Sequence, residues 1–220
     1  PRATLASWDA ATGRITLRVS CQTPTGVRDE LCTDVLSIAP ERMRVLVGDV
    51  GGGFGMKTTL YAEDVVAAFA TRALARPVKW TADRMEEFVA ATHGRDLAST
   101  ATLALDAQGR VLALRVHSHA NLGAYATPAG VLIQLMIGPW VSTSIYDIGT
   151  IDVRIAGVLT HTTPTGPYRG AGRPEAIYTI ERLFDAAARR MGVDPAELRR
   201  RNMVRPEQMP YRNAMGKTYD

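Results

Sequence analysis

The chain has 220 residues, of which 46% are hydrophobic and 22% charged, and its formal net charge is +4. These values are typical of a globular protein and exclude a disordered or fibrous chain. Two cysteines, four histidines and the absence of a Cys-x-x-Cys pair argue against a disulfide scaffold and a structural zinc site.

The chain begins with Pro1 rather than Met, and no basic and apolar leader follows. We therefore expect a piece of a longer polypeptide, which can hold only part of an active site. Residues 116–146 contain no Asp, Glu, Lys or Arg. Prolines and polar residues interrupt them, however, so no apolar stretch approaches the roughly 20 residues of a membrane helix.

The predicted elements alternate between strands and helices. Period-two alternation predicts a strand over 14–20, and further strands are expected over 42–50, 77–81 and 151–159. An antiparallel hairpin is expected from 97–105 and 111–120, joined by a turn at 106–109. Helical periodicity predicts helices over 58–76 and 174–191.

A third helix is expected after Asp194, with Pro195 at its first position and Glu197 placed to complete a capping box. The arginines between Arg189 and Arg205 lack the interleaved aromatics of a nucleic-acid surface, so we interpret them as a solvated helix face or a subunit contact. The mixture of strands, helices and a hairpin predicts an α+β fold with mixed sheets and helices packed on them.

The strongest local signal is the glycine-rich segment 48–58, which lies between a predicted strand and a predicted helix. Glycines accept positive φ and let a ligand approach the main-chain amides, and a following helix N-terminus favours anions. A nucleotide-binding P-loop is disfavoured because Met56 stands where its last glycine belongs, although Lys57 and Thr58 match. A purely structural glycine turn is the other alternative.

A second segment, 166–175, repeats this arrangement with two arginines, and a predicted helix follows. Two such loops in one chain indicate an anionic or strongly polar ligand that both loops share.

Several motifs resemble the large, molybdenum-binding subunit of the molybdenum hydroxylases, the family of xanthine dehydrogenase, aldehyde oxidoreductases and carbon monoxide dehydrogenase. They include Gln22 after Cys21 and the segments 47–57 (VGDVGGGFGMK), 76–95, 168–182 (YRGAGRPEAIYTIER) and 193–203 (VDPAELRRRNM). The resemblance implies the first molybdopterin-binding domain over 1–205 and an irregular connection over 206–220 toward a second cofactor domain.

The resemblance also implies a molybdenum ion held by a pterin, in bacteria usually as the cytosine dinucleotide. Main-chain amides and one glutamine bind this cofactor in the family, which assigns the role here to Gln22, Gly52, Gly53, Phe54, Gly55, Arg169 and Gly170. Thr58, Ala171 and Gly172 correspond to the substrate side of the pocket. No residue is expected to bind the metal directly.

The implied reaction is hydroxylation of an aldehyde or N-heterocyclic carbon with water as the oxygen source. Electrons would leave through 2Fe-2S clusters, and in some members FAD, in a dimer of heteromers in the cytoplasm or, alternatively, the periplasm. The different-class alternative is a non-catalytic binding or assembly module.

Three departures narrow the expected reaction. Gly170 stands where carbon monoxide dehydrogenase has a copper-binding cysteine, and Thr58 stands where purine-oxidising members have a glutamate. The family's catalytic base lies beyond Asp220, so we expect no base, and no turnover, in this chain alone.

Other residues have competing interpretations. His117 and His119 can share a metal or occupy ordinary sheet positions. Cys21, next to Gln22, can approach the cofactor, be bridged to Cys32 or be a small buried thiol. Phe54 can line the cofactor or pack in the core. Arg84 and Arg95 are expected to anchor the sheet through carboxylates, with Glu86 and Asp96 among the options.

Overall fold

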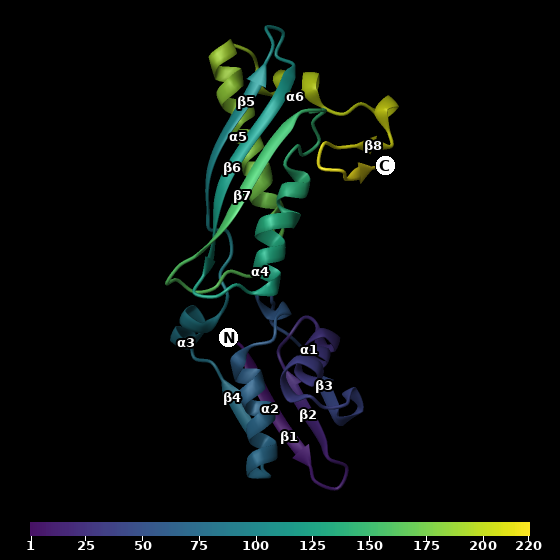
Figure 1. Ribbon diagram of the computed structural model, residues 1–220, viewed down its shortest axis with the longest axis vertical. Coiled ribbons are helices and arrows are strands. Elements are labelled where there is room, and N and C mark those ends of the chain that lie inside the picture. The colour runs from purple at the N-terminus through teal and green to yellow at the C-terminus, as the bar shows by residue number, and fades with distance from the viewer. The chain divides into compact units, whose positions relative to one another are not determined.

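The computed structural model describes residues 1–220. The chain divides into two compact units, Pro1–Thr92 and His93–Asp220, here called unit one and unit two. Each unit contains a main sheet with helices packed on it, and each of these sheets has both parallel and antiparallel strand pairs (Figure 1). The predicted α+β fold with mixed sheets is confirmed.

Unit one is built on a four-stranded sheet in the order β3-β2-β1-β4. Its strands are β1 (Ala3–Asp9), β2 (Arg14–Val19), β3 (Met43–Leu46) and β4 (Val78–Thr81), and its helices are α1 (Pro24–Glu30), α2 (Ala62–Leu74) and α3 (Arg84–Ala90). Leu17 of β2 and Ala68 of α2 are fully buried in one hydrophobic core. The alternating pattern of β2 therefore positions its apolar side chains as predicted.

Unit two contains a three-stranded sheet in the order β5-β6-β7. Its strands are β5 (Leu97–Leu105), β6 (Val111–Gly123) and β7 (Ile151–Leu159), and its helices are α4 (Pro128–Leu132), α5 (Arg173–Met191) and α6 (Pro195–Asn202). The predicted hairpin is confirmed as β5 and β6, with β7 parallel to β6 (Figure 1). Ile180 and Phe184 of α5 are buried in the same core as Leu114 of β6.

Two boundaries and one helix cap differ from the prediction. The second predicted strand stops at Leu46 and α2 starts only at Ala62, so a long loop with a single 3-10 turn, Met56–Thr58, replaces the expected ends. Asp194 accepts a hydrogen bond from the Glu197 N–H at 2.9 Å, as expected of a cap. The capping box is incomplete, however, because the Glu197 carboxylate pairs with Arg201 and Arg200 instead.

Residues 206–220 are ordered rather than irregular. They form a 3-10 turn, Pro206–Gln208, and a small hairpin of β8 (Tyr211–Arg212) and β9 (Thr218–Tyr219). The Tyr211 hydroxyl donates to Asp147 at 3.1 Å, and the Asn213 side chain donates to the Trp140 carbonyl at 3.0 Å. These hydrogen bonds attach the hairpin to unit two.

No helix combines the length and hydropathy that a bilayer crossing requires.

Candidate cofactor-binding site

The first glycine loop of unit one adopts an unusual backbone between β3 and the 3-10 turn. Gly52, Phe54 and Gly55 have φ values of 99°, 51° and 100°. Positive φ is costly for a residue with a side chain and is concentrated at functional sites. The Phe54 side chain is 57% exposed, so its interpretation as a core residue is wrong.

Gln22, which lies 33 positions before Gly55 in the sequence, fixes the shape of this loop. Its Oε1 accepts a hydrogen bond from the Gly55 N–H at 2.9 Å, and its own main-chain N–H donates to the Lys57 carbonyl at 2.7 Å. Because Oε1 is the acceptor, the side-chain amino group remains a free donor. A Cβ at Gly53 would lie 2.3 Å from Oε1, so only glycine leaves room for the Gln22 side chain.

The loop presents main-chain donors without acceptors in the protein. The N–H groups of Gly52, Gly53 and Phe54 make no hydrogen bond within the chain, whereas the Gly55 N–H donates to Gln22 Oε1 and the Met56 N–H donates to the Gly53 carbonyl. Unpaired main-chain donors on consecutive residues can together bind an anionic or oxygen-rich group.

Two observations argue against the nucleotide-binding alternative for this loop. Lys57, which a P-loop would present to phosphates, is only 7% exposed. The Thr58 hydroxyl donates to the Gly55 carbonyl at 2.7 Å and so is already engaged within the loop. The expected support from a helix N-terminus is also absent, since α2 begins only at Ala62.

The second glycine loop, in unit two, places three successive residues at positive φ. Gly170, Ala171 and Gly172 have φ values of 93°, 48° and 84°, and α5 begins directly afterwards at Arg173. The N–H groups of Arg169 and Gly170 have no acceptor in the chain, and both residues are exposed. Unlike the first loop, this one does open into a long helix, whose N-terminus favours negative charge.

Arg95 contacts this second loop rather than the carboxylate of Asp96. Its guanidinium donates to the Arg169 carbonyl, lies 4.3 Å from the centre of the Tyr168 ring, and is 3.5 Å from Glu175 Oε1. Asp96 instead accepts a hydrogen bond from Asn121 at 2.7 Å. The expectation that Arg95 pairs with a carboxylate is confirmed by Glu175, but the expectation that this pair anchors the sheet is wrong, because Glu175 lies on α5.

The expectation for Arg84 is also wrong, because this arginine makes no ion pair. Glu86, its expected partner, accepts a hydrogen bond from the Asp83 N–H at 2.9 Å and completes the N-terminal cap of α3. The carboxylate is therefore committed to the helix cap.

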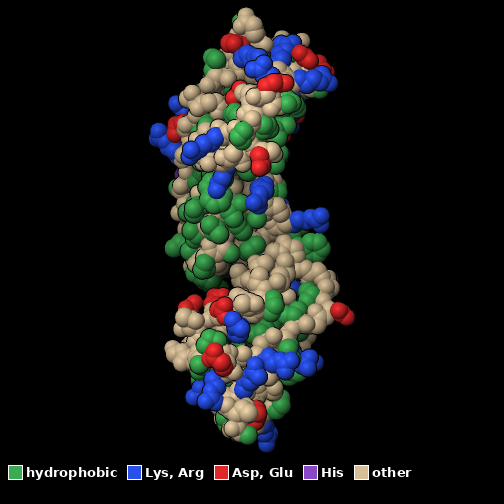
Figure 2. Space-filling model, turned by 90° about the vertical axis from the view of Figure 1, so that its right-hand side faces the viewer, with side chains coloured by type: hydrophobic (Ala, Val, Ile, Leu, Met, Phe, Trp, Pro, Cys, Tyr) green, Lys and Arg blue, Asp and Glu red, His purple; other side chains and the backbone are tan.

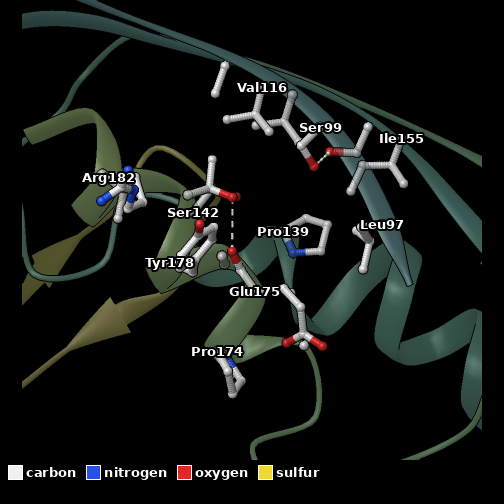
Figure 3. Close-up of a pocket in the computed structure, with 18 of the residues that line it drawn as sticks. Leu97, Ser99, Val116, Pro139, Ser142, Ile155, Pro174, Glu175, Tyr178 and Arg182 are labelled. Atoms are coloured by element: carbon white, nitrogen blue, oxygen red, sulfur yellow. Dashed lines mark hydrogen bonds between the residues drawn. The ribbon is translucent and has the colours of Figure 1, made fainter. Parts of the chain in front are cut away.

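A cavity of about 850 Å³ lies between the sheet and α5 of unit two. Its labelled lining in Figure 3 comprises Leu97, Ser99, Val116, Pro139, Ser142, Ile155, Pro174, Glu175, Tyr178 and Arg182. Gly172, predicted for the substrate side, also lines it. Sequence reasoning missed this cavity because its lining is assembled from ordinary apolar and small residues of separate elements.

The histidines and cysteines occupy structural positions. His117 and His119 both lie on the outer face of β6, where His117 Nε2 is 3.2 Å from Asp152 Oδ2. No group of three or more His, Cys, Asp and Glu residues could hold a metal ion. Cys21 and Cys32 are both unbridged and buried, and burial raises the pKa of each thiol.

The arginine-rich end of unit two carries mixed charge. Figure 2 shows Lys and Arg side chains interspersed with Asp and Glu at one end of the molecule. Arg199 of α6 pairs with Glu181 at 2.6 Å and Asp185 at 2.9 Å, both on α5. These ion pairs join two helices and neutralise part of the cluster.

Glycine loops with free main-chain donors, one bound by a glutamine and one opening into a long helix, are typical of a domain that binds an anionic or oxygen-rich ligand through its main-chain amides. The molybdopterin cofactor-binding domain family matches residues 1–203, and the chain belongs to this family. The family match spans both compact units.

Three similar proteins extend the comparison. The chain is 37% identical over 226 residues to the carbon monoxide dehydrogenase large chain of Hydrogenophaga pseudoflava, covering 98% of this chain and 27% of that protein. It is 33% identical over 225 residues to the nicotine 6-hydroxylase large subunit of Paenarthrobacter nicotinovorans, covering 100% and 27%. The crystal structure of quinoline 2-oxidoreductase from Pseudomonas putida 86 matches with a TM-score of 0.95 at 36% identity, covering 99% of this chain and 28% of that one.

These comparisons confirm the predicted resemblance. The chain is a molybdopterin-binding domain of the molybdenum hydroxylase family, and it spans about a quarter of the length of the curated relatives named above.

Proposed function

We propose that the chain is the cofactor-binding part of a bacterial molybdenum-dependent oxidoreductase that hydroxylates an aldehyde or an N-heterocyclic carbon, with water as the oxygen source. The names of two similar proteins give nicotine and quinoline as the compounds they act on, and both are N-heterocycles. The shared family and the glycine loops support this proposal; the substrate itself is inferred from those relatives.

The observation that carries the proposal is the lock between Gln22 and Gly55. Gln22 Oε1 accepts the Gly55 N–H, so the side-chain amino group remains a donor, and the N–H groups of Gly52, Gly53 and Phe54 have no acceptor in the chain. A pterin-bound molybdenum cofactor is rich in oxygen and sulfur acceptors, so this donor set fits it.

We propose Gln22 and residues 52–55 of unit one as cofactor-binding residues, and the N–H groups of Arg169 and Gly170 of unit two as further cofactor-binding groups. When bound, the molybdenum centre supplies the two-electron oxidation of an electron-poor carbon. The chain's own contribution is to bind and orient the cofactor with donors that need no rearrangement. Thr58, Ala171 and Gly172 are the proposed substrate-side residues, and the catalytic base is proposed to lie outside residues 1–220.

Carbon monoxide oxidation is a less favoured alternative. Gly170 has no sulfur, and a Cβ added there would lie 2.4 Å from Pro174 Cγ, so a cysteine would require the start of α5 to shift. Purine oxidation is disfavoured because Thr58 is not a glutamate and its hydroxyl is engaged by Gly55.

The remaining proposals concern the cofactor form and the partners. The names of the two curated relatives describe a large chain and a large subunit, so these relatives belong to multi-subunit assemblies. We propose the cytosine dinucleotide form of the cofactor, an iron-sulfur partner subunit with 2Fe-2S clusters, and in addition an FAD partner. A cytoplasmic dimer of heteromers is the proposed assembly.

The decisive experiment measures molybdenum and pterin in the full-length protein purified from its native host. About one molybdenum and one pterin per large subunit are expected, because one molybdenum centre with its pterin is the unit that acts in catalysis. A folded protein that contains neither would support the alternative of a non-catalytic assembly module and refute the proposed enzyme.

A substitution tests the placement of the cofactor at the first loop. Gly55→Val should abolish cofactor retention, because φ is 100° at this position and the Gln22 lock uses its N–H. Amide exchange in β5 and β6 should be unchanged. Gly149→Val is the matched control, since a Cβ at Gly149 meets nothing within 4 Å. Unchanged molybdenum in Gly55→Val would refute the placement.

A further inference from the structure

The second glycine loop is clamped by the short segment that precedes β5. The His93 N–H donates to the Pro164 carbonyl at 3.0 Å, and the Gly166 N–H donates back to the His93 carbonyl at 2.7 Å. A Cβ at Gly94 would lie 2.7 Å from the Cβ of Tyr168, so only glycine at position 94 allows the two segments to lie this close together. These contacts therefore place the next residue, Arg95, beside the loop.

Arg95 itself has a strained backbone. Its φ is 59°, in the left-handed region where a residue with a side chain is disfavoured and glycine is the usual occupant. Such strain persists only where the surroundings require it. Here the left-handed turn aims the guanidinium at three groups of the loop and of α5: the Arg169 carbonyl, the Tyr168 ring and Glu175.

We propose that Arg95 is a positioning residue that sets the orientation of the free donors in the second glycine loop before the cofactor binds. The Arg169 carbonyl and the Gly170 N–H belong to one planar trans peptide, so they point in opposite directions. When Arg95 holds the carbonyl, the Gly170 N–H is turned away from Arg95 and fixed. Ordering donors in advance lowers the entropic cost of binding. This inference rests on the proposed function for the identity of the ligand.

The chemistry of the three contacts explains why the residue is an arginine. A planar guanidinium can donate to a carbonyl, stack on an aromatic ring and pair with a carboxylate at once, whereas a lysine ammonium is a point charge on a flexible stem. Glu175 depends on this partner, because its second oxygen, Oε2, is buried without a hydrogen bond. Removing Arg95 would therefore leave a carboxylate unpaired at the first turn of α5.

The test compares Arg95→Gln, Arg95→Lys and Glu175→Gln in the full-length protein. Hydrogen exchange of the 166–173 segment is measured in protein made without the cofactor, and molybdenum content is measured in protein from the native host. Arg95→Gln should accelerate exchange of the Ala171 amide by about tenfold, the effect of losing a hydrogen bond to a charged donor. Molybdenum content should fall as well.

Two further variants and a control show whether the change in exchange comes from the contacts of Arg95. Arg95→Lys should recover part of the protection, and Glu175→Gln should show a smaller loss than Arg95→Gln. Arg115→Gln is the matched control, because Arg115 also pairs with a carboxylate in unit two but lies on the outer sheet face, 3.2 Å from Asp152. It should change neither measurement.

Each outcome decides a separate question. Wild-type exchange and wild-type molybdenum content in Arg95→Gln would overturn the inference. Molybdenum absent from the wild-type protein would refute the proposed function, whereas the exchange measurement on cofactor-free protein would still decide whether Arg95 positions the loop. Where Arg95→Gln fails to fold, seen as lost protection in β5 and β6, wild-type exchange in both Arg95→Lys and Glu175→Gln would overturn the inference.

Discussion

The first glycine loop owes its shape to one side chain and to glycines within the loop, whereas the second is held from outside. In the first, Gln22 accepts the Gly55 N–H and lies where a Cβ of Gly53 would be. In the second, the segment 93–95 contacts the loop, Glu175 pairs with Arg95, and α5 continues the loop.

The difference shows two ways to hold unpaired main-chain donors in place. A loop whose free donors depend mainly on one side chain, Gln22, should lose its shape through a single small change at that contact. A loop held by several contacts should tolerate the loss of any one of them more gradually. The following substitutions test this contrast, and the last concerns a buried carboxyl of α2.

The largest effect is expected from Gly53→Ala. Its Cβ would lie 2.3 Å from Gln22 Oε1, so either the glutamine or the loop must move. We expect the molybdenum content of the full-length protein to fall by about tenfold or more, the cost of overpacking a contact that sets the donors. Gly51→Ala is the control, because a Cβ at Gly51 meets nothing within 4 Å. Equal metal contents in the two variants would contradict the lock.

A smaller effect is expected from Gly170→Ala in the second loop. The alanine would hold φ near 93° and its Cβ would lie 2.4 Å from Pro174 Cγ, which together cost about 1–3 kcal/mol. The Ala171 and Arg173 amides should exchange faster while β5 and β6 keep their protection. Gly149→Ala, which meets no neighbour, should behave as wild type. Loss of exchange protection throughout unit two would show that the loop is not held independently of the sheet.

The smallest effect is expected from Asp64→Asn, for which the free energy of unfolding is measured as a function of pH. Burial raises the pKa of the Asp64 carboxyl in α2, so the folded chain holds this proton more tightly than the unfolded chain. The free energy of unfolding should therefore fall as pH rises from the ordinary carboxyl range through the raised value. The asparagine variant should lose this dependence and gain stability relative to wild type toward neutral pH, as measured by urea unfolding from pH 3.5 to 7.

Asp152→Asn supplies a control of opposite sign. A hydrogen bond from His117 holds the pKa of the Asp152 carboxyl below its usual value, so its contribution is present above the unfolded-state pKa and is lost as pH falls. This variant should lose stability relative to wild type toward neutral pH. The same sign for both variants would contradict the assigned environments.

Most of the secondary structure could be predicted, and the misses have a common cause. The alternation of β2 and the cap at Asp194 are local signals. The strand β1, with sequence ATLASWD, was missed because its buried positions include Thr4 and Ala6, which carry little hydrophobic signal. The early end of β3 and the late start of α2 reflect a loop whose shape is set by contacts outside its own sequence.

The sequence by itself determined the α+β class, the hairpin, the two glycine loops and the family, because periodicity, turn residues and long motifs depend on neighbouring positions. Only the tertiary structure decided how each loop is held. Gln22 reaches Gly55 across 33 positions, and Arg95 reaches Arg169 across 74. Contacts at such separations depend on how strands and helices pack. That packing is determined by residues throughout the core and not by the residues next to either loop.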